Sequence, residues 1–270
     1  MAINKKMTVG TCVVTLSYVS CFIGPIQGIT DDIHNRKAVL PLIDKVSRYM
    51  NRSSRIDDPI AFPQGDIVVS QMSVKRGDCN ICDLTYTFEK GKKYCIMGNS
   101  GTGKTTLLDV LSSKIAPETG CITIGGCSNK ECSSHFFYAN QQVHIFNTGY
   151  SENVSVFGSY LIDDEIDATL RYILGDERYN LLTHCSNCLQ LSGGEKQLVS
   201  FARCLFSKRD YIFLDEPFSA VDIGTRQKLL DYICEQKKTV IMVSHDASDS
   251  KFFDVVLQLQ NGKLIERVND

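Results

Sequence analysis

The chain has 270 residues, of which 43% are hydrophobic, and this content is ordinary for one large soluble domain or two smaller ones. Its 29 lysines and arginines are balanced by 31 aspartates and glutamates, so no basic excess indicates nucleic-acid binding and any phosphate binding must be local. The 12 cysteines are spread along the chain, which is typical of reduced cytosolic thiols and unlike a small disulfide-bonded domain.

An uncharged stretch covers residues 8–29, after Lys5 and Lys6 and before Asp31 and Asp32. It is long enough to cross a bilayer, and its serines, threonines, glycines and proline suit a helix packed among other membrane helices. We therefore expect a transmembrane helix here. A buried helix of a soluble domain is the competing interpretation, and a signal peptide is disfavoured because no small-residue cleavage site precedes an obvious mature start.

Between residues 34 and 51, apolar residues recur at helical spacing, which indicates an amphipathic continuation of this helix. The following segment is polar and contains Pro59 and Pro63, so it is the expected linker. The expected organisation is therefore a transmembrane helix with its extension in residues 1–51, a linker in residues 52–65 and one domain in residues 66–270.

After Gly65, three short runs are β-branched or alternate between apolar and polar residues, as in antiparallel strands. They are Asp66–Ser70, Leu84–Phe88 and Cys121–Ile124. Four other runs are almost continuously apolar, as expected for parallel strands that are covered on both faces. They are Tyr94–Met97, Phe136–Ala139, Tyr211–Leu214 and Thr239–Val243. The sequence therefore predicts an α/β fold with a parallel core sheet and a mostly antiparallel piece.

A glycine-rich loop follows the first of the continuously apolar runs and matches the pattern G-x-x-x-x-G-K-[ST]. Its glycines allow successive backbone N–H groups to point into one concavity, and the loop leads into a helix whose N-terminus also attracts anions. Lys104 would reach the terminal phosphates of a nucleotide, and Thr105 would hold Mg²⁺. The residues expected to bind the nucleotide here are Gly98, Asn99, Ser100, Gly101, Thr102, Gly103, Lys104, Thr105 and Thr106.

The other continuously apolar runs also end in polar residues of catalytic types, namely Asn140-Gln141, Asp215-Glu216 and Ser244-His245. Ligands of open α/β sheets bind at the carboxyl ends of the strands, so all these residues should converge on one site. Asp215 is then the expected Mg²⁺ ligand, Glu216 the general base for an attacking water, and His245 a hydrogen-bond partner of the γ-phosphate.

The segment Leu191–Glu195, with the sequence LSGGE, is the most specific motif in the chain. Ser192 and Glu195 have the spacing of a capping box, and apolar residues follow them at helical spacing. This pattern by itself indicates a well-capped helix. The two glycines, however, would also let a phosphate approach the helix N-terminus.

From Asp66 to Asp270 the chain resembles the nucleotide-binding domain of ATP-binding cassette (ABC) transporters. The family's motifs occur in order as Walker A (Gly98–Thr105), the Q-loop glutamine (Gln141), the signature (Leu191–Glu195), the Walker B aspartate (Asp215), the D-loop (Ser219–Asp222) and the switch histidine (His245). The resemblance implies a P-loop NTPase fold with a RecA-like parallel core, an antiparallel β subdomain and a helical subdomain at about residues 145–205. It also implies Mg-dependent ATPase activity with ATP and Mg²⁺ as cofactors. Gln141 would then be both a Mg²⁺ ligand and a catalytic residue beside Glu216 and His245.

The same resemblance implies a head-to-tail dimer, with a second copy or with a different chain. In that dimer Ser192 and its glycines, Gly193 and Gly194, would close on the ATP held by the partner's Walker A, and dimerisation would drive transport. Asp222 of the D-loop is also expected among the nucleotide-binding residues. The N-terminal stretch is similar to the last membrane helix of exporters, and Phe146–Val154 is similar to the exporter region that contacts the membrane domain. We therefore expect a subunit or C-terminal part of an exporter in the cell membrane, with its ATP-binding domain in the cytoplasm, transmembrane helices as partners and no nucleic acid. The sequence does not indicate the transported substrate.

Two segments depart from the family pattern. Arg76 stands near the position of the aromatic residue that stacks on adenine. The base would therefore either stack on the guanidinium group or be bound weakly. Thr183–Cys188 occupies the place where exporters carry glycines and an acidic coupling residue.

Two alternative functions stay open. In the first, the chain is a soluble regulatory or mechanical cassette protein that acts on ribosomes or DNA, although such proteins usually carry two cassettes. In the second, which the two departures support, it is a partner that binds nucleotide without turnover. A zinc site formed by the pairs Cys79/Cys82 and Cys185/Cys188 is disfavoured because the pairs lie far apart in the sequence.

Overall fold

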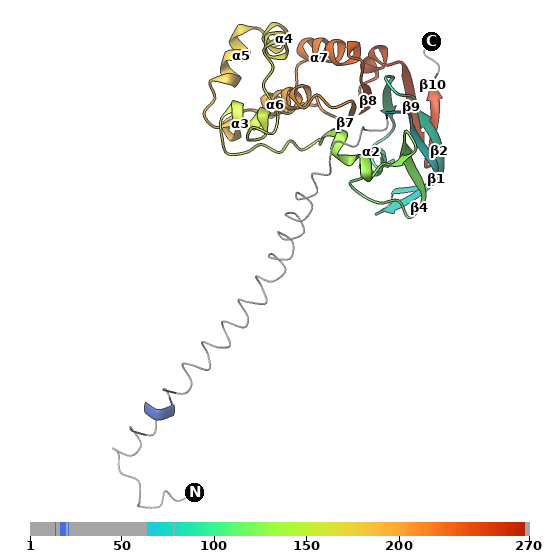
Figure 1. Cartoon of the computed structure of the whole chain (residues 1–270), viewed down its shortest axis with the longest axis horizontal. Coiled ribbons are helices and arrows are strands. Elements are labelled where there is room, and N and C mark those ends of the chain that lie inside the picture. Colours follow the sequence, from blue (N-terminus) through green and yellow to red (C-terminus); the bar gives the residue numbers. More distant parts are fainter. Residues whose placement is uncertain (1–13, 15–16, 20, 22–63, 78, 268–270) are drawn as a thin grey trace, which may run out of the picture. The chain divides into compact units, whose positions relative to one another are not determined.

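The computed structural model describes residues 14, 17–19, 21, 64–77 and 79–267 (Figure 1). The chain divides into two units, Met1–Ile60 and Ala61–Asp270, which are described separately. In the first unit the described residues are helical and exposed. No helix among the described residues is long and apolar enough to span a membrane. The helices expected at residues 8–29 and 34–51 and the linker expected at residues 52–65 lie almost entirely outside the described residues.

The second unit is built on a six-stranded sheet with the order β10-β9-β3-β8-β7-β6. Its strands are β3 (Lys93–Met97), β6 (Phe136–Ala139), β7 (Tyr211–Asp215), β8 (Thr239–Val243), β9 (Val255–Gln260) and β10 (Lys263–Arg267). All neighbours pair in parallel except β10, which is antiparallel to β9. The four predicted parallel strands are confirmed. Strand β9 was not predicted, because Gln258 and Gln260 interrupt its apolar run.

Both faces of this sheet are covered, which explains the continuously apolar strands. On β7, Tyr211 and Phe213 belong to one core cluster, whereas Ile212 and Leu214 belong to the other. The first cluster joins the sheet to helix α2 (Lys104–Leu111) and to the antiparallel sheet. The second joins it to the helices described below. Alternation of polar and apolar residues is therefore absent from β7 and β8, which are buried at every residue.

A four-stranded antiparallel sheet has the order β2-β1-β4-β5. Its strands are β1 (Ile67–Arg76), β2 (Cys79–Phe88), β4 (Thr119–Ile124) and β5 (Cys127–Ser128). The three predicted antiparallel strands are confirmed, but β1 and β2 are each 10 residues long and extend beyond the predicted runs. Their pairing shifts register between Val69 and Val74, and Gln71 and Asp83 have positive φ values of 47° and 50°. Such irregularities break the period of two on which the prediction depended.

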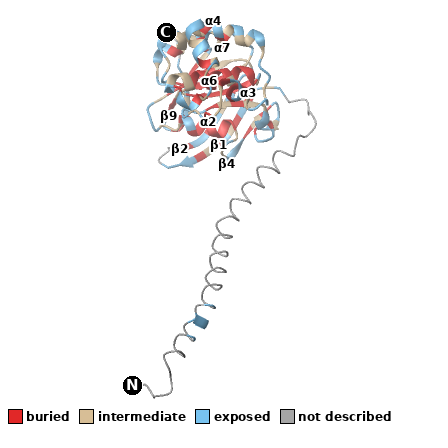
Figure 2. Ribbon diagram, turned by 90° about the vertical axis from the view of Figure 1, so that its left-hand side faces the viewer, coloured by how far each residue is buried: buried red, intermediate tan, exposed pale blue. Residues whose placement is uncertain are grey.

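Most helices lie on the second core cluster. They are α3 (Tyr150–Ser155), α4 (Asp164–Leu174), α5 (Asp176–Thr183), α6 (Gly193–Phe206) and α7 (Ile223–Glu235), with the 3₁₀ turns η1 (Glu131–His135), η2 (Cys188–Gln190) and η3 (Ala247–Phe252). Helices α2 and α6 are mostly buried (Figure 2), whereas α4 buries only Leu170 and Ile173 and α5 buries only Leu182. The range expected for a helical subdomain, residues 145–205, contains α3 to α5 and nearly all of α6.

Candidate functional site

The glycine-rich loop connects β3 to α2 and bends back on itself. The hydroxyl of Thr102 donates to Asn99 O at 2.9 Å, and Lys104 Nζ donates to Gly98 O at 2.8 Å and to Asn99 O at 2.9 Å. Gly98 leaves no room for a side chain, because a Cβ there would lie 2.9 Å from the backbone oxygen of Leu259. The loop is therefore shaped by its own hydrogen bonds and by close packing against β9.

The start of α2 is suited to bind an anion. Gly103 occupies the N-cap position with φ 99° and has no side chain that could accept a hydrogen bond from the first N–H groups of the helix. Those N–H groups carry the positive end of the helix dipole. Lys104, in the first turn, is only 5% exposed, and burial lowers its pKa although Glu216 and Asp215 act against that shift. Positive charge and unpaired donors therefore meet at one place.

A cavity of about 400 Å³ lies at this loop. Ten predicted site residues line it, namely Arg76, Ser100, Gly101, Gly103, Lys104, Thr105, Thr106, Gln141, Glu216 and His245. These residues come from the ends of β1, β3, β6, β7 and β8 and from α2. The convergence predicted at the carboxyl ends of the parallel strands is observed for Gln141, Glu216 and His245, whereas Asn140, Asp215 and Ser244 are not among the lining residues. Gly98, Asn99 and Thr102 belong to the same loop but are not among the lining residues.

Asp215, the last residue of β7, is 3% exposed and accepts a hydrogen bond from the Thr105 side chain. Burial is the largest cause that raises its pKa, with Glu216 and Asp109 adding to it, while the Thr105 hydrogen bond acts in the opposite direction. A buried carboxylate beside a hydroxyl is an oxygen donor set of the kind that Mg²⁺ prefers. A cation would also relieve the electrostatic cost of the ionised carboxylate.

Glu216 is held by both of its predicted catalytic neighbours. Gln141 Nε2 donates to its Oε2 at 2.9 Å, and His245 Nε2 contacts its Oε1. Its backbone has a φ of 48°, a conformation that is uncommon for residues other than glycine, and its N–H donates to Val243 O at 3.2 Å. Backbone strain of this kind often occurs where a side chain must be aimed at a functional site.

The predicted capping box at the start of α6 is confirmed. The Glu195 N–H donates to Ser192 Oγ at 3.3 Å, and Glu195 Oε2 accepts from the Ser192 N–H at 2.7 Å. A Cβ on Gly194 would lie 2.4 Å from Ala220 O, so this glycine also permits close packing of α6 on residues 219–222. That packing was not predicted. Ser192, Gly193 and Gly194 do not line the cavity of their own chain.

Asp222 also lies outside the cavity and caps helix α7. Its Oδ1 accepts from the Thr225 N–H at 3.0 Å, and its Oδ2 accepts from Arg178 Nη1 at 2.7 Å. The Arg178 hydrogen bond, followed by the bond from the Thr225 backbone, lowers the pKa of Asp222 to about 2. The capping role explains an aspartate at this position without any ligand.

Arg76 is anchored at the edge of the cavity by a residue that sequence reasoning missed. Its Nη1 donates to Asp109 Oδ2 at 2.8 Å, and Asp109 Oδ1 accepts from the Tyr138 hydroxyl at 3.0 Å. The Asp109 side chain is 12% exposed, whereas that of Arg76 is 59% exposed. An aspartate on the buried face of α2 was the available sign that a cation would lie nearby.

The unusual segment before the signature packs on the segment that follows Gln141. The Cys188 N–H donates to Thr148 O at 2.9 Å, and a Cβ on Gly149 would lie 3.3 Å from Cys185 O. Within the described part of the chain, no three His, Cys, Asp or Glu side chains are grouped as ligands of a metal ion.

Residues 81–219, slightly more than half of the chain, match the family model described as ABC transporter. The chain is 26% identical over 98% of its length to the lactococcin transport/processing ATP-binding protein LcnC-like of Lactococcus lactis, of which it covers 40%. It is 25% identical over 99% of its length to the probable multidrug resistance ABC transporter ATP-binding/permease protein YheI of Bacillus subtilis, of which it covers 49%. It therefore spans less than half the length of these two relatives.

Two further comparisons concern a shorter relative and the fold. Over 62% of its length the chain is 34% identical to the thiamine import ATP-binding protein ThiQ of Escherichia coli O157:H7, and it covers 76% of that protein. Its fold is similar, with a TM-score of 0.66 and 23% identity, to that of a bacterial Atm1-family ABC exporter with ATP bound, over 98% of this chain and 50% of that one. The resemblance seen in the sequence is confirmed, and the chain belongs to the ABC transporter family.

Proposed function

We propose that this chain is the ATP-binding and ATP-hydrolysing part of an ABC exporter. The observation that carries the proposal is the cavity in which Lys104, Gln141, Glu216 and His245 meet at the start of α2. The names of the relatives LcnC-like and YheI, which describe transport and ATP binding, support it.

The residues of the cavity fit a nucleoside triphosphate. Lys104 and the first N–H groups of α2 would bind its phosphates, because both offer donors and positive charge in a concave loop. Arg76, which Asp109 holds at the rim, would stack on the base.

The residues around Asp215 fit Mg²⁺. Thr105 and Asp215 would hold the ion, with Gln141 as a third ligand. When bound, Mg²⁺ supplies neutralisation of phosphate charge. The bound ion would also favour the ionised form of Asp215, which burial disfavours.

Glu216 is proposed as the general base that accepts a proton from the attacking water. Gln141 and His245 each bind one of its carboxylate oxygens, so they fix the direction in which the carboxylate points. His245 would in addition donate a hydrogen bond to the γ-phosphate.

Two chains would be needed for a complete site. Ser192, Gly193, Gly194 and Asp222 lie outside the cavity of their own chain, while α6 begins with a capped and glycine-rich turn. We propose that this turn and Asp222 complete the site of a second nucleotide-binding domain in a head-to-tail dimer, formed with a second copy or with a different chain. Transmembrane helices would carry the substrate, and the ATP-binding domain would lie on the cytoplasmic side of the cell membrane.

The Glu216→Gln variant tests this proposal. Glutamine keeps the shape of the side chain but cannot accept a proton, so steady-state hydrolysis of MgATP should fall by on the order of 10²-fold or more. MgATP should still produce a dimer that is detected by light scattering after gel filtration. Turnover retained by the variant would refute the role of Glu216. A wild-type chain that binds ATP without turnover, alone and with the membrane protein that copurifies with it, would instead favour the alternative of a catalytically inactive partner.

A further inference from the structure

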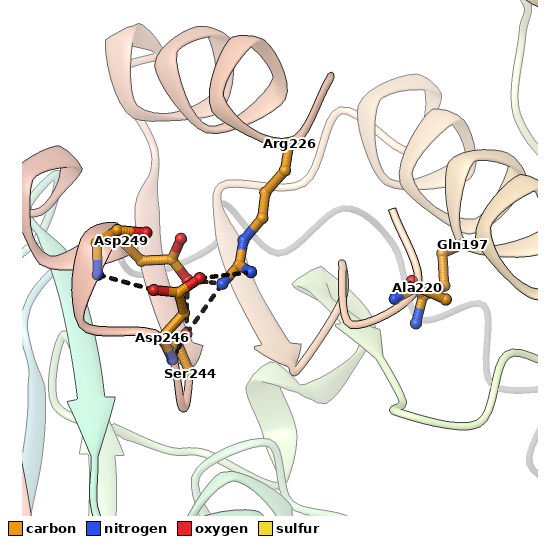
Figure 3. A network of polar contacts seen from close by, with 7 residues as sticks. Gln197, Ala220, Arg226, Ser244, Asp246 and Asp249 are labelled. Carbon is orange, nitrogen blue, oxygen red and sulfur yellow. Dashed lines mark hydrogen bonds and ion pairs between the residues drawn. The ribbon is translucent and has the colours of Figure 1, made fainter. Parts of the chain in front are cut away.

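A buried ion-pair cluster closes the loop that carries His245 (Figure 3). Asp249 in η3 is 1% exposed, and its Oδ2 accepts a hydrogen bond from the Ser244 hydroxyl at 2.5 Å and another from Arg226 Nη2. Arg226 Nη1 also lies 3.1 Å from Asp246 Oδ2. The Asp246 N–H in turn donates to Ser244 Oγ at 3.0 Å. Both sequence neighbours of His245 are thus tied to one guanidinium group.

Burying this ion pair costs solvation free energy. The side chains of Arg226 and Asp249 are 17% and 2% exposed, so both charges are largely removed from water. Arg226 Nε is buried and has no hydrogen-bond partner among the described residues. Well-packed apolar side chains would stabilise a fold at least as well as a buried ion pair. The pair therefore points to a need for a defined loop position.

Arg226 connects this loop to the signature helix. It lies in the first turn of α7, where its N–H donates to Asp222 O at 2.9 Å, directly after the D-loop residues 219–222. Gln197 on α6 lies beside Ala220 of the D-loop (Figure 3). Its Nε2 donates to Ser219 Oγ at 2.8 Å, and its Oε1 accepts from the Ala220 N–H at 2.9 Å. A continuous series of contacts therefore runs from the signature helix to the His245 loop.

We propose that Arg226 and Asp249 are positioning residues that hold His245 against Glu216 and that link its position to the signature helix. Packing contributes little to the position of the imidazole, since the His245 side chain is 46% exposed while it contacts Glu216 Oε1. Its place is therefore set by the backbone of residues 244–246, which the arginine fixes. The inference rests on the proposed function, because it assigns the pair a role in ATP hydrolysis.

The main test is Arg226→Lys in the full chain. A lysine keeps the positive charge, but its single ammonium group lacks the planar fork that bonds Asp246 and Asp249 together. We expect kcat for MgATP to fall by on the order of 10- to 100-fold, because small misplacements of catalytic groups lower rates by about this much. KM should change by less than about 3-fold, because the arginine makes no contact with the phosphate loop.

Two control variants separate positioning from folding. The double variant Arg226→Met/Asp249→Leu removes both buried charges together, so its melting temperature should stay close to that of the wild type while its kcat stays low. Arg171→Met removes an exposed arginine from the pair Arg171–Asp176, whose side chains are 55% and 73% exposed, and should leave kcat unchanged.

A double-mutant cycle identifies the residue through which the arginine acts. If Arg226 works through His245, then Arg226→Lys should not lower the residual kcat of His245→Ala any further. Hydrogen exchange of the amides of residues 244–249 should be faster in Arg226→Lys than in the wild type.

The outcomes are distinct. A wild-type chain without ATP hydrolysis would overturn the proposed function. If the wild type hydrolyses ATP, two results would overturn the positioning role. One is an unchanged kcat in Arg226→Lys and in the folded double variant, and the other is an additive effect in the His245→Ala background.

Discussion

Substitution of Gly194, the second glycine of the signature, tests how closely α6 packs against the D-loop. A Cβ at Gly194 would lie 2.4 Å from Ala220 O and 3.2 Å from Ala220 C. Both are backbone atoms, so a side-chain rotation cannot relieve the clash and the D-loop or α6 must move. Such overpacking costs about 1–3 kcal/mol. Each weakened hydrogen bond from Gln197 to the D-loop adds about 0.5–1.5 kcal/mol.

The better helix propensity of alanine offsets less than about 1 kcal/mol of the cost of the clash at residue 194. The Gly194→Ala variant should therefore be less stable than the wild type by about 1–5 kcal/mol, the sum of the overpacking and hydrogen-bond terms less the helix-propensity gain. Each kcal/mol lowers the melting temperature of a domain of this size by about 2–4 °C. Its hydrolysis should fall as well, because the start of α6 is displaced.

Gly193→Ala is the matched control. A Cβ at Gly193 would lie 3.8 Å from Ala220 Cβ, which is an ordinary contact, so this variant should be as stable as the wild type or slightly more stable. Urea and thermal denaturation of both variants measure the difference, and fluorescence of a bound nucleotide analogue checks that the chain's own phosphate loop is intact. Equal stability of the two variants would refute the packing argument.

Three further predictions follow from single residues. Arg76→Ala should weaken ATP binding by about 2- to 30-fold without changing the affinity for inorganic triphosphate, since cation–π stacking on a base contributes about 0.5–2 kcal/mol; calorimetry with both ligands decides, and equal losses would contradict a base contact. The lowered pKa of Asp222 stabilises the folded state above about pH 4, and this contribution is lost as the pH falls towards about 2. Asp222→Asn should therefore be less stable than the wild type at neutral pH, by less than about 1 kcal/mol because the ion pair is exposed. This difference in stability should vanish between about pH 4 and pH 2. Burial raises the pKa of Asp215, so ionisation of this carboxyl group lowers the stability of the folded state as the pH rises through that pKa. Without Mg²⁺, Asp215→Asn should therefore have a higher melting temperature than the wild type at pH 7 and the same melting temperature below about pH 4. Equal melting temperatures at pH 7 would contradict this argument.

The sequence predicted the core sheet well because its strands are covered on both faces. Runs such as Tyr211–Leu214 are apolar throughout, and their polar endings mark the carboxyl edge where the site lies. Strand β9 was missed because its glutamines break the apolar run. The lengths of β1 and β2 were missed because register shifts and the positive φ values at Gln71 and Asp83 hide the alternating period.

The parts of the site that could not be predicted depend on tertiary contacts. The motif indicates that Gly194 belongs to a helix start, but only the fold shows that Ala220 leaves no space beside it. Arg76 was identified as a departure from the family, whereas its partner Asp109 lies 33 residues away. The Arg226–Asp249 pair joins α7 to η3 and has no signature in local sequence.

Mixing two inactive variants tests whether two chains share each ATP site. Lys104→Ala removes the phosphate-binding lysine, and Gly193→Asp places a carboxylate at the start of α6, where it would repel a phosphate without a backbone clash. Each variant alone should be inactive. If copies of this chain pair head to tail, a mixed dimer contains one intact site and one doubly damaged site, and an equal mixture should recover about a quarter of the wild-type turnover. An equal mixture with no activity, from variants of an active wild type that still form dimers, would contradict the shared site.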